Sequence, residues 1–567
     1  MPFGKLNIKS SLNGSFKLML WPLILLLAVF ALYGQFLWNP IVFDDLPFFL
    51  LNDDGHQPVD DYRYNPFELR SLPYASLAWG KALFGLDMLH FRIENLLLHA
   101  AVAVALFFFL ARLFAAVGGS DFSPTAPWNS MDQVGLKPDL QKSARLSPEA
   151  LAFCAALLFA LHPVAVYAAG YLVQRTMLLA TLFSLLAMLA WLRGDEGESK
   201  PWLWASVLFY YLAVFSKEHA IMLPAILLAL TILLHEDWRE KLKQRWAPIA
   251  GLVLLALFVV AAKKGVLGTA YEIYAPDMLV EAGSDLNHPL SVLTQSWLFF
   301  KYAALWLFPN PNWMSVDMRE PFAASLWSGY LAAFFAFLAW GTLAVWLLFK
   351  RGRLGLLGFA LLFPWLMFLP EFSTIRIQES FVLYRSYLWA VGACALLPLL
   401  LDRIDKRMAG IVVGAVALAM FPISMERLAS FSHPLLLWDD AVKLVNDKSD
   451  LPGVYRIYYN RGGAFIREDD YAAAVVDLTI SARLNPDWPF AHNNLGVALL
   501  KLDRWAEAAV EFSNAIESAQ RKNLGMNPRP YFGRAMAYEN LGKSDLARRD
   551  YELTCKLAHK GCDKLAD

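Results

Sequence analysis

The chain has 567 residues, of which 57% are hydrophobic and only 18% are charged. This composition is too apolar for a soluble protein of this size and indicates an integral membrane protein. The formal net charge is zero and four cysteines are spread along the chain, so nucleic-acid binding and a disulfide-rich scaffold are both excluded.

Apolar stretches follow one another from Lys17 to Ile423, and each is about long enough to cross the hydrocarbon core of a bilayer as a helix. The first, 18–38, has no Ala-x-Ala-like site after it, so we interpret it as an uncleaved span and not as a signal peptide. The other predicted stretches are 94–116, 149–168, 173–193, 201–216, 219–235, 247–264, 291–308, 325–349, 354–370, 384–401 and 409–424.

Lysine and arginine gather in certain connectors, which the positive-inside rule places in the cytoplasm. These connectors are the N-terminus, 137–145, 239–245, 350–353 and 403–407. All of these connectors lie on the same side of the membrane only if one stretch between 247 and 325 does not cross the membrane completely. The best candidate is 291–308, which carries Gln295 and Lys301 and is expected to lie at the interface or to re-enter. The N-terminus is then cytoplasmic and the C-terminal part lies outside the cytoplasm.

The loop 39–92 is therefore a long non-cytoplasmic segment, and long loops in compact folds usually carry function. Its most informative residues are Asp44 and Asp45 in "NPIVFDDLPFFLLND", just beyond the first span. Carboxylates at an apolar boundary are costly unless they are solvated, paired or functional. One of them is a candidate general base for an acceptor hydroxyl. The alternative is that both are loop residues that cap a short helix.

A repeat with a period of 34 residues follows Trp438 and predicts tetratricopeptide (TPR) units. Gly462, Ala464, Tyr471, Ala474 and Pro486 occupy its small, aromatic and breaker positions, and 34 residues later stand Gly496, Ala498, Trp505 and Ala508. The sequence thus predicts an all-α protein with a polytopic membrane domain over 1–430 and a TPR solenoid over 431–567. The expected repeats are about 455–488, 489–522 and 528–561. Cys555 and Cys562 close the last repeat and can pair if that end faces an oxidising compartment.

Five stretches of the membrane part, in this order, resemble the transmembrane-and-TPR family of protein O-mannosyltransferases within the GT-C superfamily of lipid-sugar-dependent glycosyltransferases. They are "FDDLPFFLLND", "ELRSLPYASLAWGKALFGLDMLHFRIENLLLH", "LLFALHPVAVYAAGYLVQRTMLLA", "VFSKEHAIMLPAILL" and "ESFVLYRSYLWAVG". The resemblance implies a polytopic GT-C-type fold and a polyprenyl- or dolichyl-phosphate sugar as donor. It also implies an acidic base in the first external loop, which falls on Asp44 or Asp45, with Asp44 favoured. No metal and no other cofactor is expected.

The donor phosphate needs a fixed cation on the outer side, and arginine gives the best bidentate contacts with phosphate oxygens. Arg385 in "LYRSYL" matches the arginine of the corresponding family stretch. The further candidates lie at outer ends of spans, and each basic one has interfacial snorkelling as its alternative. The phosphate-binding candidates are Arg385, Arg376, Arg175 and Lys217, with Glu218, His162, Gln174 and Tyr387 as supporting residues. A structural role is the alternative for His162, as for any lone histidine in an apolar helix.

The sequence departs from the family in two places. The stretch "VLYRSYLW" offers Arg385 no acidic partner nearby, and only three full repeats are visible, fewer than in many relatives.

Three functions remain open from the sequence. The first is a glycosyltransferase that moves a lipid-phosphate sugar to a protein Ser/Thr or a glycan hydroxyl, with the repeats selecting the acceptor. The second is a membrane-anchored TPR scaffold for an envelope complex, and the third is an oligosaccharide ligase or polymerase. Short connectors suggest a bacterial inner membrane with a periplasmic repeat domain. The sugar, the acceptor and the choice between a mono- and a diphosphate donor are not determined.

Overall fold

A computed structural model describes residues 8–50, 57–121, 146–272, 274–279, 284–401, 404–445 and 450–565. These residues form helices joined by turns and loops, and their only strand-like pairing is an isolated bridge between Met318 and Phe381. The all-α prediction is therefore confirmed. The basic connector 137–145, Arg403 and part of the loop 39–92 lie outside the described residues.

The chain forms two compact units. The first consists of 1–314, 322–377 and 382–432, and the second of 315–321, 378–381 and 433–567. Two short segments that the sequence assigned to the membrane domain thus belong to the repeat unit. Arg319 and Arg456 both donate to the backbone oxygen of Gln378, at 2.8 and 3.5 Å, and so tie these segments to the repeat unit.

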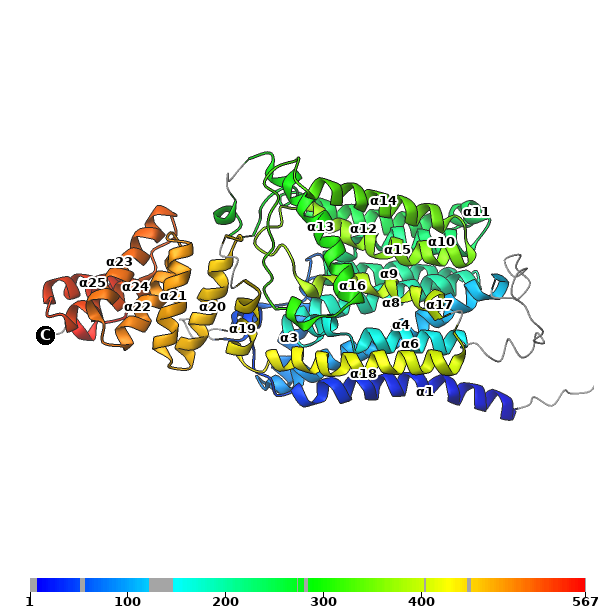
Figure 1. The fold of residues 1–567 in the computed structure, drawn as a ribbon, viewed down its shortest axis with the longest axis horizontal. Helices are drawn as coiled ribbons and strands as arrows, with labels where there is room; N and C mark the ends of the chain where they lie inside the picture. Colours follow the sequence, from blue (N-terminus) through cyan, green and yellow to red (C-terminus); the bar gives the residue numbers. More distant parts are fainter. Residues whose placement is uncertain are drawn as a thin grey trace, which may run out of the picture. The chain divides into compact units, whose positions relative to one another are not determined.

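Long apolar helices make up the first unit, and several of them run alongside one another (Figure 1). They are α1 (Ile8–Tyr33), α4 (Met88–Asp121), α6 (Pro148–Ala160), α8 (Arg175–Glu196), α9 (Lys200–Ser216), α10 (Leu223–Leu234), α12 (Trp246–Ala262), α13 (Asn287–Leu307), α14 (Tyr330–Leu348), α15 (Gly352–Phe368) and α18 (Lys406–Ser430). Two short helices, α16 (Ser386–Ala393) and α17 (Leu397–Leu401), lie within the apolar segment Leu383–Leu401. Shorter helices lie in the connectors: α2 (Leu46–Phe49), α3 (Ser71–Phe84), α7 (Val166–Ala169) and α11 (Trp238–Gln244).

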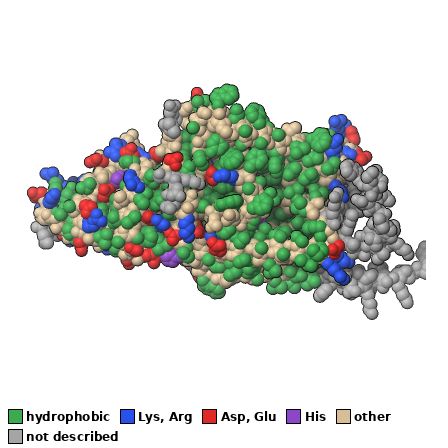
Figure 2. All heavy atoms as spheres, in the orientation of Figure 1, with side chains coloured by type: hydrophobic (Ala, Val, Ile, Leu, Met, Phe, Trp, Pro, Cys, Tyr) green, Lys and Arg blue, Asp and Glu red, His purple; other side chains and the backbone are tan. Residues whose placement is uncertain are grey.

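By length and composition, 6 helical segments among the described residues can cross a membrane, or up to 8 if each of two bent pairs is one span. The bent pairs are α6 with Pro163–Ala169 and α11 with α12, and the apolar helices Leu20–Phe36 and Glu218–Leu234 are shorter. The predicted stretches 201–216 and 291–308 are not among these segments. Hydrophobic side chains cover much of the visible surface of this unit (Figure 2). The exposed apolar side chains of this unit include Leu254 (65% exposed) and Leu418 (76% exposed). A surface this apolar is covered by lipid, so the chain is an integral membrane protein.

Helix α13 contains the stretch 291–308, for which the sequence predicts an interfacial or re-entrant segment. Near its start, His288 contacts the backbone oxygen of Phe372, which follows the C-terminal end of α15. Near its end, the Trp306 indole donates to Ser386, the first residue of α16, at 2.9 Å. Both ends of α13 therefore contact residues in or next to the connector that links α15 to α16.

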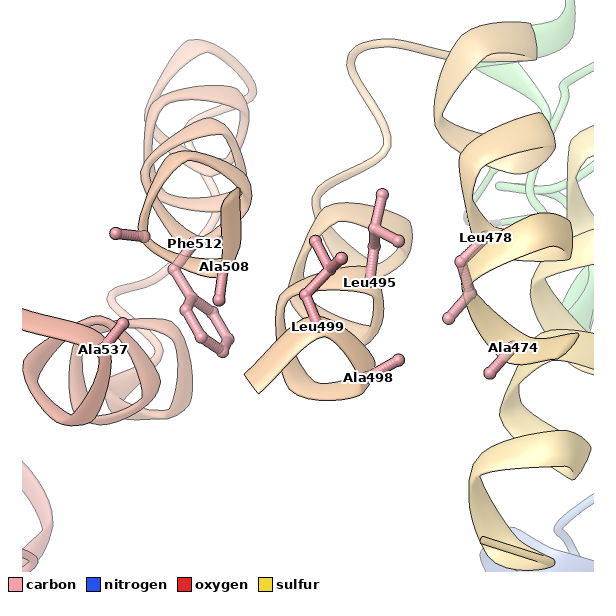
Figure 3. Packing of buried hydrophobic residues seen from close by; sticks show 9 residues of the cluster. Ala474, Leu478, Leu495, Ala498, Leu499, Ala508, Phe512 and Ala537 are labelled. Atoms are coloured by element: carbon pink, nitrogen blue, oxygen red, sulfur yellow. The ribbon is translucent and has the colours of Figure 1, made fainter. Parts of the chain in front are cut away.

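Helices α19 (Pro434–Val445) to α25 form the repeat unit. The pairs are α20 (Val454–Arg467) with α21 (Tyr471–Leu484), α22 (Pro489–Lys501) with α23 (Trp505–Arg521), and α24 (Pro528–Asn540) with α25 (Ser544–Ala558). Each predicted repeat contains one pair, and successive pairs pack together. Their shared core includes Ala474, Leu478, Leu499 and Phe512 (Figure 3). Cys555, in the last turn of α25, forms a disulfide with Cys562, which follows that helix.

Small residues let the helices of neighbouring repeats approach, as the repeat pattern predicts. The buried Phe512 ring lies between Gly496 and Gly533. A Cβ atom would lie 2.8 Å from the ring at Gly496 and 2.3 Å from it at Gly533. The ring cannot move away from one position without approaching the other.

The substitution Gly533→Ala is therefore expected to destabilise the repeat unit by about 1–3 kcal/mol, the usual cost of overpacking a core. Thermal unfolding and limited proteolysis of the full chain in detergent measure this. Gly525→Ala is the matched control, because no atom lies within 4 Å of the added Cβ. Equal stability of the two variants would contradict the packing argument.

Candidate active site

Asp44 and Asp45 have different surroundings. They lie in a 3-10 turn, Phe43–Asp45, which leads into α2, where Pro47 occupies the first turn. Asp44 is partly exposed, whereas Asp45 is completely buried. The Asp45 carboxylate accepts hydrogen bonds from the backbone N–H groups of Val173 and Leu172, at 2.9 and 3.3 Å.

Local backbone geometry explains why these two N–H groups are available. Helix α7 ends at Gly170, Tyr171 is extended, and a new 3-10 turn, Leu172–Gln174, leads into α8. The first N–H groups of a helix have no partner within it, and a negative charge at that end is favourable. Asp45 thus acts as a cap supplied by a distant part of the chain. Burial raises the pKa of Asp45 to about 7, while the Val173 N–H and then Arg92 oppose that rise.

Arg92 joins the same two segments through backbone oxygens. Its guanidinium donates to Asn39 at 2.7 Å, to Gly170 at 3.0 Å and to Pro40. The Asn95 amide donates to the backbone oxygens of Tyr171 and Leu172, at 3.3 and 3.2 Å. We call the contacts of Asp45, Arg92 and Asn95 with the segments 39–45 and 170–173 the brace.

Arg175, a predicted phosphate ligand, contacts Asn95 of the brace. Its guanidinium forms an ion pair with Glu94 at 2.7 Å and donates to Asn95 at 2.8 Å and to Ser76 at 3.2 Å. Protein groups therefore already surround this cation. Gln174, the preceding residue, is also buried.

Two tyrosines connect Asp44 with a predicted cation. The backbone N–H of Asp44 donates to the Tyr171 hydroxyl at 2.7 Å. The Tyr171 ring meets the Tyr384 ring edge-on, with centroids 6.4 Å apart, and Lys217 lies over the Tyr384 ring, with its Nζ 5.8 Å from the centroid. Asp44 and Lys217 thus flank one aromatic pair.

Arg385 does have an acidic partner, which the sequence did not reveal. Its Nη1 lies 3.2 Å from the carboxylate of Glu371, which is completely buried in the turn after α15. The same carboxylate lies 3.3 Å from Arg376 Nε and 2.7 Å from His219 Nε2. The structure therefore brings Arg385 and Arg376 together, next to the hairpin that carries Lys217.

Arg376 has further partners that hold it in place. It forms a second ion pair with Glu272 at 3.4 Å and donates to the Tyr271 hydroxyl at 2.9 Å. Arg376 thus links Glu371 to the loop that contains Tyr271 and Glu272.

The supporting candidates have internal partners. The Glu218 carboxylate accepts hydrogen bonds from Nε and Nη2 of Arg70, one to each oxygen. His162 packs on the Trp306 ring and reaches the Trp306 backbone oxygen at 3.1 Å. The Tyr387 hydroxyl lies 2.7 Å from His99 Nδ1. These contacts match the structural alternative weighed for His162.

Sequence reasoning missed four residues of this region: Arg92, Asn95, Tyr171 and Glu371. The first three stand in the stretches "FRIENLLLH" and "AAGYLVQR", where polar groups interrupt apolar helices. Glu371 stands alone at the end of an apolar run, in "FLPEFS". A polar residue inside an apolar segment costs free energy unless it has a specific partner. The polar residues that interrupt these apolar segments are therefore the signal that could have identified the four residues. Among the described residues, no group of three or more His, Cys, Asp or Glu is arranged to hold a metal ion.

The two aspartates are expected to differ in their effect on stability. Asp45→Ala leaves two buried N–H groups without an acceptor, at a cost of about 1–3 kcal/mol each. Asp44→Ala removes a partly exposed side chain and should cost much less. Thermal unfolding of the full chain in detergent compares the two, and a larger loss for Asp44→Ala would contradict the assignment of Asp45 to the brace.

Comparisons with known proteins find similarity to protein mannosyltransferases. Residues 142–262 match the family described as dolichyl-phosphate-mannose-protein mannosyltransferase. The chain is 22% identical over 553 residues to a Drosophila melanogaster protein O-mannosyl-transferase, Tmtc3, with 84% of this chain and 56% of the relative covered. The chain thus spans about half the length of that curated relative. The resemblance stated from the sequence motifs is confirmed: the chain is similar to membrane protein O-mannosyltransferases of the GT-C type.

Proposed function

We propose that this chain is a membrane glycosyltransferase, which transfers a sugar from a polyprenyl-phosphate donor to a protein Ser/Thr or glycan hydroxyl on the non-cytoplasmic side. The observation that carries the proposal is the pair of Asp44 and Lys217 on either side of the Tyr171 and Tyr384 rings. The names of the family and of the relative both describe mannose transfer to protein, so mannose is the sugar to test first.

The proposed reaction is a direct displacement. Asp44 takes the proton of the acceptor hydroxyl, and the hydroxyl oxygen forms a bond with the anomeric carbon of the sugar. The bond between that carbon and the phosphate oxygen breaks, and the lipid phosphate leaves with the electron pair. Displacement from the opposite face inverts the anomeric configuration. A carboxylate is basic enough to assist this step once the site excludes water.

The leaving phosphate needs positive charge that is already in place. Arg385 and Lys217 are the proposed ligands, with Arg376 behind them. Glu371 and Glu272 pair with these arginines and hold them in place, and Lys217 brings a further positive charge to the cluster. Arg175 has its own acidic partner and is proposed to support the brace instead. No metal is proposed, because the cations can balance the phosphate charge.

We propose that the repeats select the acceptor protein outside the cytoplasm. Helical repeat arrays present extended surfaces for peptides. The Cys555–Cys562 disulfide supports this side of the membrane, because disulfides persist in oxidising compartments. The proposed membrane is a bacterial inner membrane, with the N-terminus in the cytoplasm.

Replacing the proposed base tests the function. The purified full-length chain is incubated with polyprenyl-phosphate mannose and a membrane-protein extract from cells that lack this chain. Acceptor proteins in the extract should then become labelled with mannose. Asp44→Asn should lower the rate about 100-fold or more, the usual contribution of a general base, while the unfolding temperature stays at the wild-type value. A scaffold predicts no transfer in either protein and a wild-type phenotype for the variant. Transfer of whole oligosaccharides from a lipid diphosphate would identify the ligase alternative.

Replacing the proposed cations tests the donor site. Arg385→Lys loses the bidentate geometry, and Lys217→Gln loses a charge, so each should raise the donor KM about tenfold or more. Initial rates over a range of donor concentrations measure this. Lys350→Gln is the control, because Lys350 is exposed in the connector between α14 and α15. An unchanged donor KM in both site variants would place the phosphate elsewhere.

A further inference from the structure

Tyr171, which the sequence analysis did not single out, contacts the proposed base directly. It is 1% exposed and lies in the extended link between α7 and α8. Its hydroxyl oxygen accepts the backbone N–H of Asp44 at 2.7 Å, so the hydrogen of that hydroxyl is free to be donated in another direction. The Asp44 carboxylate also forms a hydrogen bond with this hydroxyl.

The phenol can keep this donor role throughout the reaction. Burial, and then the neighbouring Asp44 and Asp45 carboxylates, hold the pKa of Tyr171 well above its usual range. The hydroxyl therefore stays protonated near neutral pH. A proton donor fixed on one carboxylate oxygen leaves the other oxygen to receive a proton from the acceptor.

The ring is fixed on several sides. Its neighbours are the rings of Phe43, Tyr384 and Phe431, with centroids 6.3, 6.4 and 6.3 Å away. The brace holds the backbone of Tyr171 through Asn95. The hydroxyl is therefore positioned by packing before any substrate binds, which is the condition for an effective orienting group.

We propose that Tyr171 is the positioning residue of the reaction, whose hydroxyl links the backbone N–H and the carboxylate of Asp44 and fixes the orientation of that carboxylate toward the acceptor. This inference rests on the proposed role of Asp44 as the base. Tyr171 does not contact the reacting atoms, so its effect is on the base and not on donor binding.

The variant Tyr171→Phe keeps the ring and removes only the hydroxyl. We expect kcat to fall about tenfold or more, as for the loss of a hydrogen bond to a charged group, with the donor KM unchanged. The low-pH limb of the rate profile should move to higher pH, because a carboxylate that loses a donor binds its proton more tightly. A structural role alone would not move that limb.

Tyr551→Phe is the matched control. It also removes a buried tyrosine hydroxyl that donates to a carboxylate, here to Glu539 at 2.6 Å in the third repeat. Its kcat and pH profile should match the wild type, and unfolding temperatures of both variants show whether either one is misfolded.

A second measurement keeps the phenol in place. Incorporation of 3,5-difluorotyrosine at position 171 makes the hydroxyl a stronger donor, so the low-pH limb should move to lower pH. If Asp44→Asn retains full transfer, the proposed function fails. If Asp44→Asn is inactive but neither change at Tyr171 moves the limb, the proposed function stands and the role of Tyr171 is overturned.

Discussion

The candidate site depends on one hydrogen-bonded cap: the Asp45 carboxylate on the free N–H groups of Leu172 and Val173. These residues are separated by more than a hundred positions along the chain, and they belong to two different connectors. Without the cap, the N-terminal end of the α8 region would leave buried donors unsatisfied, and Asp45 would be a buried charge without compensation. Each segment thus needs the other, which fixes the position of Asp44 next to Tyr171.

The cationic side chains of the candidate site are held by shared ion pairs. Glu371 is shared by two arginines and by His219. A carboxylate shared in this way keeps the guanidinium groups in fixed places in a buried setting. Glu272 is a second acidic partner of Arg376, and Glu94 is the acidic partner of Arg175. In the proposed function, Lys217 adds the further positive charge that attracts the donor phosphate.

Sequence reasoning predicted the all-helical fold because hydrophobic length and the repeat period are local signals. The pairing of Gly496 with Phe512 follows from the same repeat pattern that the sequence displays. The partners of the site residues could not be predicted in this way. Asp45 with Leu172 and Tyr171 with Asp44 are contacts between distant segments, and nothing in the local pattern states which connectors meet. Glu371 was missed for the same reason. A turn and a loop separate it from Arg385, and the conformation of that loop could not be predicted from the sequence.

The adjacency of Asp44 and Asp45 now has a physical explanation. A single carboxylate cannot both accept two buried backbone N–H groups and remain accessible to an acceptor hydroxyl. In a 3-10 turn, neighbouring side chains point in different directions, so one aspartate can face the protein interior while the other remains partly exposed. Asp45 anchors the turn, and the anchored turn holds Asp44 in place. This division also explains why Asp44, the more accessible of the two, is the residue that Tyr171 contacts through its backbone and its side chain.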